Sequence, residues 1–315
     1  DEIDKILAGG KTPAGTHRPI MVAEIMAFLA PKPGELAVDC TLGYGGHAGE
    51  LLGAVQPGGC LIGVDTDPIE LPKTEARLRS LGYPSESLIV RRMNYAGILQ
   101  AISEVSPNGA DVMLADLGLS SMQIDNPARG FTFKSDGPLD MRMNPDHGLP
   151  VSSLLSKISP AELAAILATN ADEPRSVPLA KAILDSHTKC PLRTTTELAD
   201  ALSAFLRGRG IIDVDETKET TRRVFQALRI AVNDEFGALD RFLGLLPACL
   251  RPGGRIAILT FHSGEDRRVK RAFKEGLRAG GFSWISDEVI RPSAEEQRSN
   301  PRSSSAKLRL AIRGD

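Results

Sequence analysis

The chain has 315 residues, of which 42% are hydrophobic and 25% are charged, and its formal net charge is −2. This length can bury the core of one or two domains, and the composition is that of an ordinary globular protein. The charge excludes a globally basic nucleic-acid binder, so any RNA contact must come from local patches, and no apolar run reaches the ~18 residues that a membrane helix needs.

A helical spacing over 19–29 precedes the most informative stretch of the chain, residues 36–49. The short apolar run at 36–40 predicts a buried strand. Glycines at 43, 45, 46 and 49 follow it, around the start of a helix predicted near His47, and glycine lets a ligand approach the main chain. The pattern fits G-x-G-x-x-G/A, and Asp65 follows Gly43 by 22 residues. It therefore predicts a nucleoside-containing ligand, either a nicotinamide dinucleotide or S-adenosylmethionine (SAM).

Strands and helices then alternate. Strands are predicted at 60–65, 88–90 and 111–116, with helices at 68–81 and 95–105 between them. This alternation predicts a Rossmann-like α/β fold, a parallel sheet with helices on both faces. Ligands bind beyond the carboxyl ends of such strands, so we expect Asp39, Asp65 and Asp116 to converge there.

After Asp116 the alternation stops. Residues 118–150 are loop-like, and helices are predicted at about 161–169, 177–187, 195–206, 217–233 and 236–250. The sheet resumes at 252–260, and the stretches 282–289 and 307–312 could add an antiparallel hairpin at its edge. We therefore expect one domain from 1–125 and 230–315, with an inserted all-helical, substrate-recognition domain at 126–229.

Two acids and a tyrosine at the predicted strand ends have competing interpretations. Asp65 could accept hydrogen bonds from both ribose hydroxyls. Asp67 is better explained as a helix cap, because a metal site at Asp65-Thr-Asp67 would lack a third ligand. No metal is therefore predicted. The ring of Tyr95 could pack on an adenine or belong to the core.

Three polar residues are candidates for the chemistry. Asp116, followed by a Gly118 turn, suits a site that holds an amine. Asn233 ends a polar row on one helix face, which could equally be a solvated face. His262 follows the strand at 252–260 and is either a site residue or a core histidine.

Two basic runs lie near the C-terminus and are either solvated surface or an RNA-binding surface. The candidates for RNA contact are Arg267, Arg268, Arg302, Lys307 and Arg309.

Several long and unusual strings resemble the ribosomal RNA small-subunit methyltransferase H family, also called MraW. The resemblance runs from about His17 to Arg313 and includes Asp39-Cys-Thr-Leu-Gly-Tyr-Gly-Gly-His47, Asp65-Thr-Asp-Pro68, Asp116-Leu-Gly-Leu-Ser-Ser-Met-Gln-Ile-Asp125, Arg129-Gly-Phe131, Gly137-Pro-Leu-Asp-Met-Arg-Met143, Phe225-Gln-Ala-Leu-Arg-Ile-Ala-Val-Asn-Asp-Glu235, Phe261-His-Ser263 and Ser305-Ala-Lys-Leu-Arg309.

The resemblance implies a class I SAM-dependent methyltransferase that acts on N4 of a cytidine in the decoding region of small-subunit (16S-type) rRNA. Its partner would be that rRNA or the small ribosomal subunit. By matching motif, SAM would contact Gly45, Gly46, His47, Asp65, Tyr95, Asp116 and Gln123.

Methylation of cytosine N4 needs help, because the lone pair of this amine is delocalised into the ring. An acceptor at N4 would drain charge as the methyl group transfers, so catalysis would consist mostly of positioning and electrostatics. Asp116 is the leading catalytic candidate, followed by Asn233 and His262. The sequence does not separate an Asp116 that binds the methionine amine from one that touches the base.

Other classes stay open. A nicotinamide-dependent oxidoreductase would use the same glycine turn, and a non-catalytic rRNA-binding assembly factor would keep the basic runs. Thr66, Gly264 and Ser304 depart from the family pattern, which leaves room for another RNA site or an organellar ribosome. Four scattered cysteines fit a reduced, cytoplasmic compartment, or an organelle if a targeting peptide was removed before Asp1.

Overall fold

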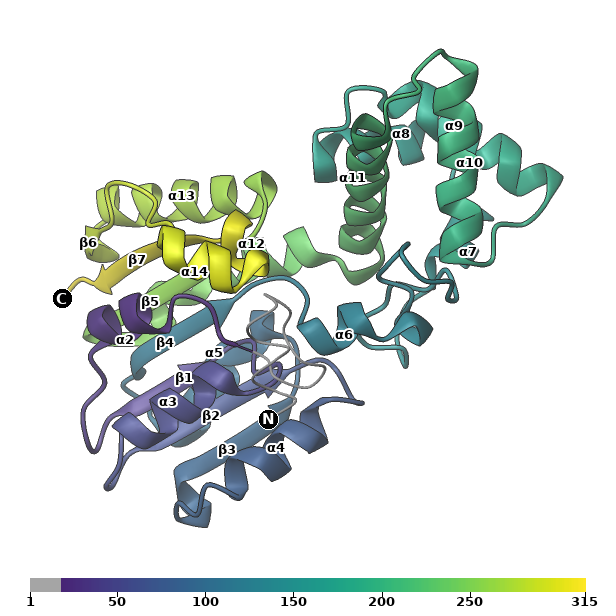
Figure 1. Cartoon of the computed structure of the whole chain (residues 1–315). Coiled ribbons are helices and arrows are strands. Elements are labelled where there is room, and N and C mark those ends of the chain that lie inside the picture. The colour runs from purple at the N-terminus through teal and green to yellow at the C-terminus, as the bar shows by residue number, and fades with distance from the viewer. Residues whose placement is uncertain (1–17) are drawn as a thin grey trace. The chain divides into compact units, whose positions relative to one another are not determined.

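The computed structural model of the chain describes residues 18–315 and divides into two units. Of the described residues, 18–118 and Gly237–Asp315 form the first unit, and Leu119–Phe236 form the second (Figure 1). The expected insertion at 126–229 starts and ends inside the second unit. The difference arises because α6 (Ser121–Asp125) contacts the short 3-10 helix η3 (Pro127–Arg129), and because α11 (Val214–Asn233) is one uninterrupted helix.

A seven-stranded sheet forms the centre of the first unit, in the order β3-β2-β1-β4-β5-β7-β6. The first five strands are parallel, whereas β7 is antiparallel to both of its neighbours. The predicted Rossmann-like sheet is thus confirmed. The strands are β1 (Leu36–Asp39), β2 (Cys60–Asp65), β3 (Leu88–Arg92), β4 (Ala110–Asp116), β5 (Leu250–Thr260), β6 (Phe282–Ile285) and β7 (Lys307–Arg313).

The last two strands pair as predicted but do not form a simple hairpin. The helix α14 (Ala294–Ser299) and the 3-10 helix η4 (Pro301–Ser305) lie between them in the chain. β7 also pairs with β5, so it is an interior strand, and β6 is the edge.

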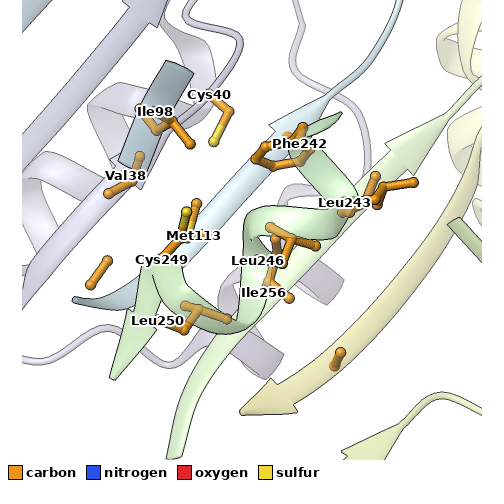
Figure 2. Packing of buried hydrophobic residues seen from close by; sticks show 14 of the residues in the cluster. Val38, Cys40, Ile98, Met113, Phe242, Leu243, Leu246, Cys249, Leu250 and Ile256 are labelled. Atoms are coloured by element: carbon orange, nitrogen blue, oxygen red, sulfur yellow. The ribbon is translucent and has the colours of Figure 1, made fainter. Parts of the chain in front are cut away.

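Helices cover both faces of this sheet, because successive side chains along each strand point to opposite faces. Ala37 packs with α2 (Val22–Leu29), α3 (Gly46–Ala54) and α4 (Leu71–Arg79), whereas Val38 packs on the opposite face. The helices of that second face are α5 (Ile98–Val105), α12 (Glu235–Cys249) and α13 (Ser263–Arg278). Figure 2 shows part of this layer, in which Phe242 and Leu246 of α12 pack with Val38, Ile98 and Met113. The short 3-10 helices η1 (Ser85–Ser87) and η2 (Tyr95–Gly97) flank β3.

The strand register brings three acids to one edge of the sheet. Asp39 lies level with Leu114 of β4, two positions before Asp116, and Asp116 lies level with Leu259 of β5. Asp65 ends β2 two positions after Gly63, the neighbour of Asp39. The predicted convergence of Asp39, Asp65 and Asp116 at the carboxyl edge is therefore confirmed.

The second unit is helical around its own apolar core, which includes Leu167, Leu179, Leu198 and Leu228. Side-chain caps explain where two of its helices begin, because Ser159 with Glu162, and Thr194 with Glu197, form reciprocal capping boxes. In addition to α6 and α11, its helices are α7 (Val151–Leu155), α8 (Pro160–Ala171), α9 (Ser176–Lys189) and α10 (Thr195–Gly208). Within 18–315, no helix of either unit is both long and apolar enough to cross a membrane.

Candidate active site

Helix α4 packs against the glycine turn between β1 and α3 and forms hydrogen bonds with it. Gly43 and Gly45 adopt left-handed φ angles of 47° and 85°. A Cβ on Gly45 would lie 2.9 Å from Cγ2 of Thr74, while the Thr74 hydroxyl donates to the Gly43 carbonyl at 2.6 Å. Arg77 donates to the Tyr44 carbonyl at 3.2 Å, and its guanidinium lies 3.9 Å from the Tyr44 ring centroid. A side chain at position 45 would therefore break both the backbone conformation and the packing.

The helix that follows this turn presents backbone donors to it. The first N–H groups of a helix have no intrahelical partner, and in α3 these include the N–H groups of Gly46 and His47. They can bind a negatively charged group placed at the turn. Two of the predicted cofactor contacts, Gly46 and His47, thus offer main-chain donors.

Asp65 ties the end of β2 to the glycine turn. One of its carboxylate oxygens accepts from the Gly43 N–H at 2.8 Å, and the other accepts from the Asp67 N–H at 2.9 Å. Burial raises the pKa of Asp65. Each oxygen has a second lone pair, so the carboxylate can still accept from ligand hydroxyls.

Asp67 caps a turn and not the predicted helix, because α4 begins only at Leu71 and has Glu70 as its N-cap. One oxygen of this buried side chain accepts from the N–H groups of Ile69 and Glu70, at 2.9 and 3.3 Å. In the described part of the chain, no group of three or more His, Cys, Asp or Glu side chains could hold a metal ion.

Asp116 ends β4 and is held by groups from the glycine turn. Its N–H donates to the Thr41 hydroxyl at 2.6 Å, and its Oδ2 lies 3.6 Å from Nδ1 of His47. The Asp116 side chain is 22% exposed, so a ligand can reach it, whereas His47 is 7% exposed. Burial, followed by the negative charge of Glu265, raises the pKa of Asp116 to about 7.

His47 is a neutral, inward-facing ring. Its Nε2 lies 2.9 Å from the Ile20 carbonyl, to which it donates, so Nδ1 of the neutral ring faces Asp116 with a lone pair. Burial lowers the pKa of His47, which keeps the ring neutral. The imidazole thus lies beside Asp116 at a distance too long for a hydrogen bond, and the backbone N–H of His47 is the group that could still contact the cofactor.

Asp39 completes the acidic edge. It is 2% exposed and accepts from the Thr41 N–H at 3.0 Å, and burial raises its pKa to about 6. Within 18–315, no Lys or Arg forms an ion pair with Asp39, Asp65 or Asp116. Three closely spaced carboxyl groups without a cationic partner favour a positively charged ligand.

The remaining candidates of the first unit have structural contacts of their own. His262 caps α13, since its Nδ1 accepts from the Glu265 N–H at 3.4 Å, and its Nε2 lies 3.3 Å from a Glu265 oxygen. Glu265 is 4% exposed and accepts from the Phe261 N–H. Tyr95 is half-buried, with its ring edge-on to Phe242 at 5.2 Å. This position is compatible with both interpretations of Tyr95, because only part of the ring is covered by the core.

Gln123 and Asn233 belong to the second unit. The side chain of Gln123 accepts from the Ser120 N–H and closes a capping box at the start of α6. Asn233 accepts from the Met143 N–H at 2.7 Å and donates to the carbonyls of Met141 and Arg229, both at 2.8 Å. Because these bonds use both amide hydrogens and the oxygen, Asn233 orders the loop at 141–143 rather than presenting a free amide.

The predicted RNA-contacting residues divide into exposed and buried groups. Arg267 and Arg302 are exposed, and Arg268 lies 3.4 Å from Asp240. Arg309, in contrast, is 7% exposed and makes bonds of 2.7 and 3.3 Å to the two oxygens of Asp266.

The neighbouring Lys307 lies 3.8 Å from Asp266 and is 18% exposed. The position of Arg309 argues against an RNA contact, because β7 is an interior strand and Asp266 already occupies the guanidinium.

Two residues of the site lie outside our sequence-based candidates. Thr41 holds the backbone of Asp116, and Glu265 adds a buried carboxylate beside it. The signal for Glu265 is its place three residues after His262, the spacing of a capping box. Thr41 carries no such signal, because the pairing of β1 with β4 creates its role.

The sequence of the chain is similar to those of known proteins over nearly its full length. The model of a family described as the MraW methylase family matches residues 14–313. The chain is 49% identical over 318 residues to ribosomal RNA small subunit methyltransferase H 1 of Lachnoclostridium phytofermentans, covering 99% of this chain and 86% of that protein. It is 49% identical to ribosomal RNA small subunit methyltransferase H 2 of Alkaliphilus metalliredigens, covering 99% and 90%. It is 47% identical to ribosomal RNA small subunit methyltransferase H 1 of Agathobacter rectalis, covering 100% and 90%.

Proposed function

The chain belongs to the MraW methylase family, and from this premise we propose that it methylates N4 of a cytidine in the decoding region of small-subunit rRNA. It is a SAM-dependent methyltransferase, and its sheet is the class I methyltransferase fold. The names of its relatives support small-subunit rRNA as the substrate. The cytidine, its N4 atom and the decoding region come from the resemblance of the sequence motifs.

The residues at the carboxyl edge of the sheet fit SAM. SAM carries a sulfonium and an ammonium, and the paired acids Asp39 and Asp116 favour positive charge, whereas they would repel the pyrophosphate of a nicotinamide dinucleotide. The N–H groups of Gly46 and His47 suit the methionine carboxylate, and Asp65 suits the ribose hydroxyls. This acidic edge, without a cationic partner among the described residues, is the observation that carries the proposal.

Three more residues complete the proposed cofactor contacts. Gly45 keeps the turn in its left-handed conformation against α4, Tyr95 offers the uncovered part of its ring to the adenine, and Gln123 comes from the matching family motif. When bound, SAM supplies an electrophilic methyl group. The chain then has to bind, orient and deprotonate the nucleophile.

Asp116 is the residue proposed to act on that nucleophile. An oxygen of its carboxylate accepts from the N4 amine, which favours a pyramidal nitrogen and stabilises the positive charge that develops on it. The proton that N4 loses passes to the same oxygen and from there to solvent. A pKa of about 7 matches this base to neutral pH. The Thr41 hydroxyl fixes the backbone of Asp116.

The substrate base must leave its stack to reach this carboxylate, so the RNA strand has to be held on either side of it. Arg267, Arg268, Arg302 and Lys307 are the proposed phosphate contacts. Arg309 is left out, because it is buried against Asp266. Asn233 and His262 become positioning residues, since their polar atoms hold the loop at 141–143 and the start of α13.

A methyl-transfer assay tests the proposal. Small subunits that lack the modification are incubated with SAM carrying a labelled methyl group, and the RNA is digested to nucleosides for mass spectrometry. We expect the label in N4-methylcytidine from the decoding region. Label in another nucleoside or region would overturn the target. Binding of SAM and of rRNA without any transfer would instead indicate an assembly factor.

A further inference from the structure

The outer face of α13 carries a row of cations. Arg267, Lys270, Arg271, Lys274 and Arg278 follow one another at helical spacing and line one surface groove, together with Glu275. The opposite face of the helix is buried, with Val269 and Phe273 in the core of the first unit. The helix is therefore amphipathic, and the packing of its inner face fixes the direction in which the cations point.

This row of positive charge is a local feature, because the formal net charge of the whole chain is −2. Among the described residues that line the groove, only Glu275 opposes the five cations. Asp240 of α12 lies 3.4 Å from Arg268 and 3.8 Å from Arg271, at one side of the row. Over residues 18–315, Lys270, Lys274 and Arg278 take part in no ion pair. Their charges remain available to a partner.

The row starts beside the proposed active site. α13 begins directly after β5, whose Leu259 is paired with Asp116. Glu265, in the first turn of the helix, bonds to the Phe261 N–H at the end of that strand. From there α13 runs back along the sheet, where it contacts β5, β6 and β7 (Figure 1). The twelve residues from Arg267 to Arg278 span about 16 Å at 1.5 Å per residue.

We propose that the outer face of α13 binds successive phosphates of the RNA strand that carries the target nucleotide. The inference rests on the proposed function and extends it to three residues that the sequence motifs do not assign, Lys270, Lys274 and Arg278. Lys270, Lys274 and Arg278 are one helical turn apart, about 6 Å each. A linear row of this kind fits a polyanion that runs along the helix, and long flexible lysines suit contacts that do not read sequence.

Salt dependence of RNA binding tests this surface directly. The probe is a small-subunit RNA fragment that contains the decoding region, and S-adenosylhomocysteine replaces SAM so that no methyl group transfers. We expect the Lys270→Gln/Lys274→Gln variant to bind more weakly and to flatten the plot of log affinity against log salt by about 1.4, roughly 0.7 for each lost phosphate contact. Its kcat at saturating RNA should equal that of the parent, while its KM for RNA rises.

Two single variants serve as controls, one that should strengthen RNA binding and one that should leave it unchanged. Glu275→Gln removes the one acid of the groove and should strengthen RNA binding about two- to threefold at low salt. Lys32→Gln removes an exposed lysine that precedes β1, at the amino edge of the sheet, and should leave affinity and slope unchanged. A face that is only solvated would give the same slope for all three variants and the parent, which would overturn the proposal.

A second probe separates RNA from a lipid partner. If the double variant loses binding to phosphatidylserine vesicles and keeps the parent's RNA slope, the face binds anionic lipid and the proposal is wrong. The proposed function is tested separately. If the double variant shows the expected loss of slope but the parent transfers no methyl group to small subunits, the RNA-binding surface stands and the methylation proposal is wrong.

Discussion

The carboxyl edge of the sheet and the outer face of α13 begin within a few residues of each other, at the end of β5, and carry opposite charge. At the sheet edge, Asp39 is buried and Asp65 and Asp116 are partly buried, and turn amides and a hydroxyl form hydrogen bonds with them. On α13, the cations are exposed and carried on long side chains.

The difference shows how a chain with a net charge of −2 can offer a site to a cationic cofactor and a surface to a polyanion. Burial makes the acids sensitive to one another and to small changes of geometry, because desolvation raises their pKa values. Exposure makes the cations of α13 interchangeable and sensitive to salt. Substitutions at the edge should therefore have large, specific effects, and those on the helix small, additive ones.

The largest effect is expected from Asp116→Asn. The amide keeps the size of the side chain but removes the charge that stabilises N4, so methyl transfer should fall by ~10²-fold or more. Single-turnover transfer at saturating SAM measures this without confusion from weaker cofactor binding, and RNA affinity should not change. The exposed Asp287→Asn provides the matched control. Transfer at the parent rate would remove Asp116 from the chemical step.

Asp65→Ala should act on cofactor affinity. Loss of charge-assisted bonds to ribose should weaken SAM binding by about 1.5–3 kcal/mol, measured by isothermal titration. Asp67→Ala, two residues away, should instead lower the free energy of unfolding by about 1 kcal/mol, because this side chain caps the following turn. Equal losses of affinity in the two variants would contradict the division of roles.

Arg309→Met sharpens the contrast between buried and exposed cations. It leaves Asp266 without its bidentate partner and should lower the free energy of unfolding by about 2 kcal/mol, measured by denaturant unfolding. Arg302→Met, at an exposed position, should cost less than about 0.5 kcal/mol. A stable Arg309→Met protein with a reduced RNA salt slope would return this residue to the RNA surface.

The smallest effect concerns pH without cofactor. The pKa of Asp116, raised by burial from 3.8 to about 7, means that the folded protein holds this proton more tightly than the unfolded one. Its contribution to stability therefore falls as pH rises from about 4 through 7. Between pH 6 and 8, Asp116→Asn should gain about 1.4 kcal/mol on the parent, or roughly 2–4 °C in Tm.

The comparison of variant with parent measures Asp116 together with its effect on Asp39, because the negative charge of Asp116 contributes to the raised pKa of Asp39. Burial lowers the pKa of His47, so its contribution has the opposite sign, and it acts in both proteins. Thermal unfolding at the two pH values is the measurement. A constant difference in Tm would show that Asp116 is ionised throughout this range.

Much of the fold could be predicted, because its strands are short apolar runs that end in acids or follow glycine turns. Asp39, Asp65 and Asp116 converge as the βα alternation requires. Helix α13 is harder to read, because the dense charge at 267–271 hides the helical spacing of Val269 and Phe273. The expected bounds of the insertion, 126–229, differ from those of the second unit, Leu119–Phe236, because the sequence pattern does not show which unit the end helices pack against.

The site was predicted where chemistry depends on strand ends, and missed where it depends on packing. Asp65 and the glycine turn follow from their spacing. The support that Thr41 gives to Asp116 exists only because β1 pairs with β4. Arg309 is a cation in a basic tail as far as the sequence shows, and only the interior position of β7 brings it against Asp266.

The position of β7 also has a consequence for how the chain is made. β7 leaves the ribosome after β6 and yet lies between β5 and β6. Until residues 307–313 emerge, β5 has an open hydrogen-bonding edge, and β6 has no neighbour to pair with. A nascent chain at this stage therefore carries an unfinished sheet, in which direct pairing of β5 with β6 would be a kinetic trap. The sheet is completed from the inside by β7, so folding of this half of the first unit has to await the synthesis of residues 307–313.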